Sequence, residues 1–93
     1  MKIFLKKFGT VLISRPSGKE SFLALQPLIK DLKKKERIDL DFKGVSVLTP
    51  SWADEFVTPL KVRYKDRVDL TNIKNPSVIA TLETLEKAGL SRD

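Results

Sequence analysis

The chain has 93 residues, of which 41% are hydrophobic, and its formal net charge is +6. This length suits one small domain with a modest core, which we expect to span residues 1–93. The sequence contains no cysteine and no histidine, which excludes disulfides, thiolate zinc sites, cysteine nucleophiles and imidazole bases, so we expect neither an enzyme nor a metal or cofactor site. Because there is no signal-type N-terminus and no apolar run near the ~18 residues that a membrane span needs, we expect a cytoplasmic protein without membrane contacts.

The first third of the chain predicts two short strands and a helix. Residues 2–6 and 10–14 are rich in Ile, Leu, Val and Phe, and the segment 7–9, Lys-Phe-Gly, predicts a hairpin turn between them. Ser17 and Glu20 have the spacing of a capping box, which predicts a helix that begins there and ends near Lys34. The expected apolar face of this helix comprises Phe22, Leu25, Leu28, Ile29 and Leu32.

Two later segments, 37–45 and 68–72, alternate apolar and polar residues, which is the period of a strand with one buried face. A sheet buried on both faces would show continuous apolar runs, so we expect helices mainly on one face. Asp39 and Asp41 share the polar face of the first segment, ~7 Å apart by the strand rise. We expect them to face water or nearby lysines rather than to catalyse a reaction.

A helix is predicted after each of these strands. The first should start at Thr49 or Ser51 and run to about Lys65, because its apolar residues recur at helical spacing. Its expected buried residues are Trp52, Phe56 and Leu60. The last helix is predicted to have Asn75 as its cap and Gly89 at its end. Its buried stripe is expected to comprise Val78, Ile79, Leu82 and Leu85.

The resulting order is β-β-α-β-α-β-α, in which the later helices act as right-handed crossovers. We therefore predict an α/β fold with a mixed four-stranded sheet and three main helices packed mostly on one face.

The turn before the second of the three helices places the Ser51 hydroxyl at a helix N-terminus. First-turn N–H groups lack intrahelical partners and the helix dipole is positive there, so a phosphate on Ser51 would be stabilised. Ser51 is thus a candidate phosphorylation site. Alternatively, Ser51 and Asp54 have capping-box spacing, in which case Ser51 is an ordinary helix cap.

A second strand-to-helix junction lies at residues 14–19. It offers Arg15, Ser17, Gly18 and Lys19 near free amides, an arrangement that suits a phosphate-bearing ligand. The segment is not a Walker loop, since Glu20 follows Gly18-Lys19 and Ile13 occupies the position that needs glycine. A plain turn is the alternative.

Several segments resemble the STAS-like domains, a bacterial and archaeal family of mostly unassigned function. The resemblance is carried by residues 40–45 and 48–56, with 14–18 and 75–78, and so covers about residues 12–87. The parent group, the STAS domains, includes anti-sigma factor antagonists, which bind a kinase-type ATPase and are switched by phosphorylation of a serine at this turn. By position, Ser51 matches that serine and Asp41 the acidic residue of the central strand. The antagonists typically have an aspartate, two small hydroxyl residues and a glycine where this chain has Thr49, Pro50, Ser51 and Trp52.

The resemblance implies a small STAS-like layer fold and a non-enzymatic regulatory module that binds a signalling protein, such as a kinase-like ATPase. The implied partner-binding residues are Thr49, Pro50, Ser51, Trp52, Asp54 and Glu55. The alternative is a nucleic-acid-associated protein, because residues 1–46 hold 11 Lys or Arg against 5 Asp or Glu. Lys6, Lys7 and the lysines at 33–35 would then contact phosphates. The oligomeric state stays open.

Overall fold

The structure, a computed structural model, describes residues 1–91, with side chains up to residue 89. The α/β class is confirmed, with three helices: α1 (Arg15–Ile29), α2 (Pro50–Tyr64) and α3 (Pro76–Ser91). The five strands are β1 (Lys2–Phe4), β2 (Val11–Leu12), β3 (Ile38–Asp41), β4 (Val47–Leu48) and β5 (Val68–Thr71). Two short 3-10 helices, η1 (Leu5–Phe8) and η2 (Lys65–Arg67), complete the described elements.

The strands form two small parallel sheets instead of the mixed four-stranded sheet that we expected. One has the order β1-β3-β5 and the other pairs β2 with β4. The predicted hairpin is wrong, because η1 occupies the segment between β1 and β2 and buries Leu5 completely. Gly9, with a φ of 133°, then carries the chain from the first sheet to the second.

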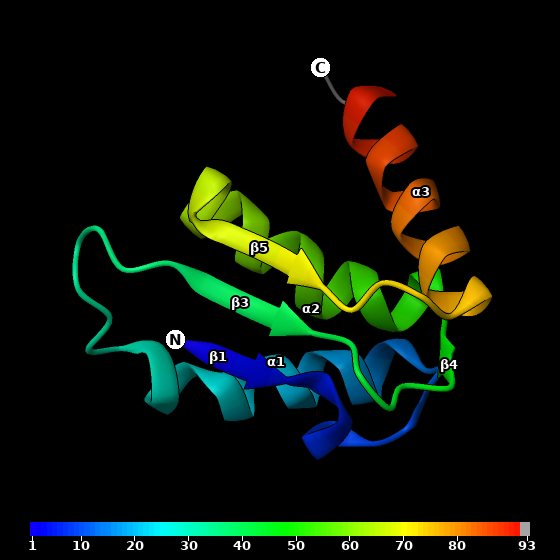
Figure 1. Cartoon of the computed structure of the whole chain (residues 1–93), viewed down its shortest axis with the longest axis horizontal. Coiled ribbons are helices and arrows are strands. Elements are labelled where there is room, and N and C mark those ends of the chain that lie inside the picture. The colour runs from blue at the N-terminus through cyan, green and yellow to red at the C-terminus, as the bar shows by residue number, and fades with distance from the viewer. Residues whose placement is uncertain (92–93) are drawn as a thin grey trace.

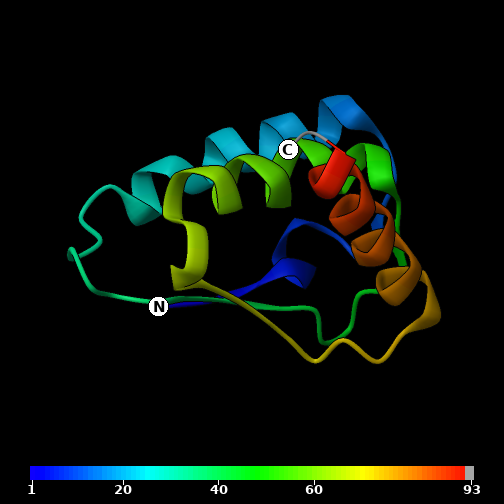
Figure 2. The same ribbon diagram turned by 90° about the horizontal axis from the view of Figure 1, so that it is seen from above.

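The three-stranded sheet is covered by helices on one face only. Figure 2 shows α1 and α2 lying side by side above the sheet, and no helix of the described residues lies on the opposite side. The buried apolar residues of β3, Ile38 and Leu40, point to the helices, while Asp39 lies on the open face in register with Lys2. The expected one-sided sheet is confirmed.

The core lies between this sheet and the helices. The expected buried face of α2 is confirmed, since Trp52, Phe56 and Leu60 are each fully buried. Trp52 stacks on Phe56 with ring centroids 4.9 Å apart. On α1, Leu25 and Ile29 are buried as expected, but Leu28 is 49% exposed.

The helix ends differ from the sequence expectations at three places, of which one is the C-terminal end of α1, at Ile29 and not near Lys34. The cap of α1 is Ser14, whose Oγ accepts a hydrogen bond from the Ser17 N–H at 3.2 Å, so the predicted Ser17 cap is wrong. The cause is Pro16, which lacks an N–H group and fits the first helical turn. At the other end of the chain Asn75 caps α3 as predicted, but the helix continues through Gly89 to Ser91.

Candidate functional site

The two strand-to-helix junctions singled out in the sequence lie side by side. β2 and β4 pair in parallel, with Leu12 opposite Leu48, so the helices that follow them start next to each other (Figure 1). Thr49 strengthens the link, because its N–H donates to the Leu12 carbonyl at 3.0 Å and its hydroxyl donates to the Ile13 carbonyl. Residues 14–19 and 49–55 therefore form one surface, which we call the junction surface.

Thr49 is the cap of α2. Its Oγ1 accepts a hydrogen bond from the Trp52 N–H at 3.3 Å. Ser51 lies one position further on, exposed in the first turn, and its hydroxyl makes no hydrogen bond within the described residues. Of the two alternatives for the start of this helix, the structure thus gives the capping role to Thr49 and leaves the Ser51 hydroxyl accessible.

Trp52, expected among the partner-binding residues, does not reach the surface. Its side chain is fully buried against Phe56, and its indole N–H donates to no described residue. The reason is the helical spacing of Trp52, Phe56 and Leu60, which directs all three into the core. The accessible part of the predicted binding segment is therefore Pro50, Ser51 and the carboxylates that follow.

Those carboxylates hold α1 and α2 together. Arg15 Nη1 lies 3.1 Å from Asp54 Oδ2 and 3.3 Å from Glu55 Oε1. The hydrogen bonds that the Arg15 guanidinium donates to Asp54 and then to Glu55 raise its pKa above the ordinary value. Arg15, a candidate for binding a ligand phosphate, is instead paired with the start of α2.

The proposed ligand loop at 14–19 is largely used for packing and capping. The Ser17 N–H is bound by Ser14 Oγ, and the Gly18 N–H donates to the Ser14 carbonyl at 3.0 Å. Gly18 is buried beneath α2, and only Lys19 extends into solvent without an ion pair in the described chain. The structure therefore favours the plain turn over a phosphate loop.

Asp41, at the end of the central strand β3, is buried and hydrogen-bonded within the fold. Its carboxylate is 2% exposed and accepts hydrogen bonds from Asn72 Nδ2 and the Lys43 N–H, both at 2.8 Å. Lys2 Nζ lies 3.5 Å from Asp41 and 3.9 Å from Asp39, so of the two expected surroundings, water or a nearby lysine, the structure shows the lysine for both carboxylates, while Asp41 is buried away from water. The Asn72 and Lys43 hydrogen bonds, with the charge of Lys2, hold the pKa of Asp41 below its ordinary value.

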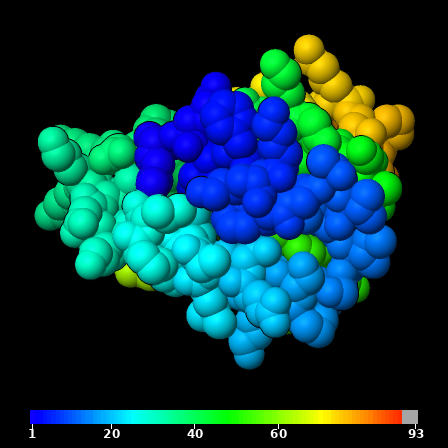
Figure 3. Space-filling model, turned by 90° about the horizontal axis from the view of Figure 1, so that it is seen from below, coloured from blue at the N-terminus to red at the C-terminus, as the bar shows by residue number. Residues whose placement is uncertain are grey.

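The two lysine groups expected to contact phosphates, Lys6 with Lys7 and the lysines at 33–35, do not lie together. Lys6 and Lys7 lie in η1, which follows the carboxyl end of β1, whereas residues 33–35 precede the amino end of the parallel strand β3. Figure 3 shows the loop before β3 to one side of the dark blue N-terminal segment. The two lysine groups therefore lie at opposite ends of the sheet.

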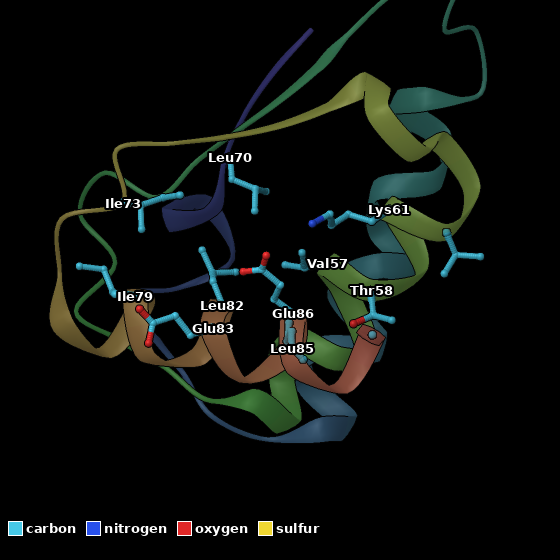
Figure 4. Close-up of a pocket in the computed structure, with 12 residues that line it drawn as sticks. Val57, Thr58, Lys61, Leu70, Ile73, Ile79, Leu82, Glu83, Leu85 and Glu86 are labelled. Atoms are coloured by element: carbon cyan, nitrogen blue, oxygen red, sulfur yellow. The ribbon is translucent and has the colours of Figure 1, made fainter. Parts of the chain in front are cut away.

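The sequence did not predict a groove between α2 and α3. This α2–α3 groove has a volume of about 890 Å³ and is closed at its base by β5 and the segment after it (Figure 4). Its apolar lining includes Val57, Leu70, Ile73, Ile79, Leu82 and Leu85. Ile79, expected to be buried, is 37% exposed. One sequence signal was available, since Val62 adds an apolar side chain beside the buried stripe of α2.

The fold and these contacts define a small parallel α/β domain with two strand-to-helix junctions joined at one surface. The family described as STAS-like domain of unknown function matches residues 25–78, more than half of the chain, and the chain belongs to that family. The match includes β3, α2 and β5, and it confirms the resemblance seen in the sequence. No curated protein and no solved structure matches the chain. None of the helices in the described part is long and apolar enough to cross a membrane.

Proposed function

We propose that the protein is a non-enzymatic regulatory module that binds a signalling protein, such as a kinase-like ATPase, through the junction surface. Phosphorylation of Ser51 would switch this binding. The observation that carries the proposal is the accessible Ser51 hydroxyl in the first turn of α2, next to a cap that Thr49 already supplies. Ser51 can therefore be modified without loss of the helix cap.

A phosphate on Ser51 changes the electrostatics of the junction surface in two ways. It adds a charge of ~−1.5 to −2 and three acceptor oxygens near the positive end of α2. It also lies within about one helical turn of Asp54 and Glu55, the two carboxylates that pair with Arg15. The new charge repels these carboxylates and competes with them for Arg15. The surface presented to a partner therefore differs between the two states.

The test is a pull-down from lysate of the source organism, with bound proteins identified by mass spectrometry and their affinities then measured with purified partner. The baits are wild type, Ser51→Ala and Ser51→Asp. We expect an ATPase or regulator to bind wild type and Ser51→Ala, and to bind Ser51→Asp at least about tenfold more weakly, a difference of ~1.4 kcal/mol in binding free energy.

Ser46→Asp is the matched control, because it adds the same charge to an exposed loop outside the junction surface. It should bind like wild type. Equal affinity of all baits would contradict the switch while leaving the binding role, and failure to retain any regulator would contradict both.

A nucleic-acid-binding function has no comparable support. The lysines that suggested it are divided between the two ends of the sheet, so they do not offer a continuous track for a phosphate backbone. Absence of DNA or RNA binding at low salt would exclude it.

A further inference from the structure

The α2–α3 groove has exposed apolar side chains in its lining. Val62 is 69% exposed, Ile79 is 37% exposed and Ile73 is 36% exposed, and all three line the groove. Apolar side chains that are exposed together in one groove are candidates for an interaction site, whereas single exposed ones are ordinary. The groove lies beside α3, away from the contact between α1 and α2, so it is distinct from the junction surface.

Charged side chains of opposite sign line the two walls of the groove. Lys61 extends from α2, and Glu83 and Glu86 belong to α3 (Figure 4). None of the three forms an ion pair within residues 1–89. With one positive and two negative side chains, the groove is weakly acidic on a chain whose net charge is +6. Two copies would therefore meet here with less repulsion than over the basic remainder of the molecule.

This arrangement is its own complement under a two-fold rotation. In an isologous contact, residue i of one subunit meets residue j of the other, and the reverse contact follows by symmetry. A surface with a lysine on one wall and glutamates on the other then makes two equivalent pairs, while the exposed apolar side chains Val62 and Ile79 are covered where the two copies meet.

We propose that the α2–α3 groove is the interface of a symmetric dimer of this chain. Lys61 of each subunit faces Glu83 and Glu86 of the partner subunit, and Val62 and Ile79 pack across the two-fold axis. The proposal is independent of the role of Ser51, because it concerns a different face of the molecule.

The test uses charge reversal and mixing, monitored by sedimentation equilibrium and light scattering. Wild type should associate to twice the monomer mass as its concentration rises. Lys61→Glu places three acidic side chains on the groove, and the double variant Glu83→Lys/Glu86→Lys places three basic ones there. Each variant alone should dissociate at concentrations where wild type is dimeric, because like charges then face each other. An equimolar mixture of the two variants should recover a dimer.

Recovery on mixing separates a paired interface from simple misfolding, since two misfolded chains would not restore each other. Circular dichroism should show native helix content for every variant. Lys34→Glu and Glu20→Lys reverse exposed charges outside the groove and should leave the dimer unchanged. Wild type that stays monomeric up to about 1 mM overturns the proposal, as does a dimer that the groove variants do not weaken or a mixture that stays monomeric.

Discussion

Gly18 on α1 packs directly against the main chain of Trp52 on α2. A Cβ atom on Gly18 would lie 2.4 Å from the Trp52 carbonyl oxygen and 3.1 Å from its carbonyl carbon. These are backbone atoms, which cannot rotate away as the end of a flexible side chain would. The glycine therefore sets how closely the two helices approach at the start of the junction surface.

Gly18→Ala should lower the free energy of unfolding by about 1–3 kcal/mol, the usual cost of an overpacked contact. The loss should appear although alanine is the better helix former by about 1 kcal/mol. Urea denaturation followed by circular dichroism measures it. Gly89→Ala on α3 is the matched control, because a Cβ there meets nothing within 4 Å, and it should raise stability by about 0.5–1 kcal/mol. Equal stability of both variants would contradict the close contact.

The sequence predicted local structure well where the relevant pattern, such as helical spacing or a helix cap, lay within one segment. The helical spacing of Trp52, Phe56 and Leu60 identified α2 and its buried face, and Asn75 identified the start of α3. These features depend on residues within a few positions of each other, so periodicity and capping preferences suffice to find them.

Strand pairing could not be predicted in the same way. The parallel partner of Ile3 is Leu40, and no residue near β1 distinguishes this distant partner from the nearby strand of a hairpin. The junction surface depends on the pairing of β2 with β4, because this pairing brings residues 14–19 next to residues 49–55. These two strands are also far apart in the sequence. The α2–α3 groove depends on how two helices pack, so the local pattern around Ile79 could not show that this side chain is exposed.

Thr49 and Ser51 should respond differently to loss of their hydroxyl groups. Thr49→Ala removes the acceptor of the Trp52 N–H and should lower the free energy of unfolding by about 0.5–2 kcal/mol. Ser51→Ala removes an exposed hydroxyl and should change stability by less than about 0.5 kcal/mol. Thermal or urea unfolding of the two variants checks this. Thr49→Ser, which keeps the capping oxygen, should recover most of the loss, and a larger effect at Ser51 than at Thr49 would show that the cap is misassigned.

Asp41 should make the stability of the fold depend on acid pH. Hydrogen bonds from Asn72 and Lys43 lower its folded-state pKa below the unfolded value of ~3.9. At pH values between the folded and the unfolded pKa of Asp41, the unfolded chain binds more protons than the folded one. The stabilisation from Asp41 is therefore fully present above pH ~4 and is lost as the pH falls through the folded pKa. Asp41→Asn should therefore flatten the acid limb of a plot of unfolding free energy against pH, with Asp31→Asn as the control for removing one exposed carboxylate.

The same carboxylate allows a direct test of the Asn72 contact. Asn72 has a φ of 55°, so Asn72→Gly removes the amide donor while retaining a backbone conformation that glycine adopts without strain. The pKa of Asp41, followed by NMR of its side-chain carboxyl carbon, should rise in this variant. An unchanged titration would show that the Lys43 amide and Lys2 alone set the pKa.

Ser77 should protect the main chain of β4 from solvent. Its Oγ accepts a hydrogen bond from the Leu48 N–H at 3.0 Å and donates to the Leu48 carbonyl at 3.1 Å, while Thr81 Oγ1 donates to the same carbonyl at 2.5 Å. In Ser77→Ala the carbonyl keeps Thr81, but the N–H of the buried Leu48 loses its partner. We expect the free energy of unfolding to fall by about 1–3 kcal/mol, the cost of an unsatisfied buried donor.

Hydrogen exchange followed by NMR should show faster exchange of the Leu48 amide in Ser77→Ala. Thr84→Ala is the control, because the Thr84 hydroxyl donates to the Ala80 carbonyl within the exposed face of α3. Loss of this hydroxyl should leave the Leu48 amide protected. Faster exchange in Ser77→Ala would show that Ser77 and Thr81 of α3 cover the unpaired main-chain edge of β4. Covering such an edge prevents it from pairing with another strand. Unchanged exchange at Leu48 would show that water replaces Ser77 without loss.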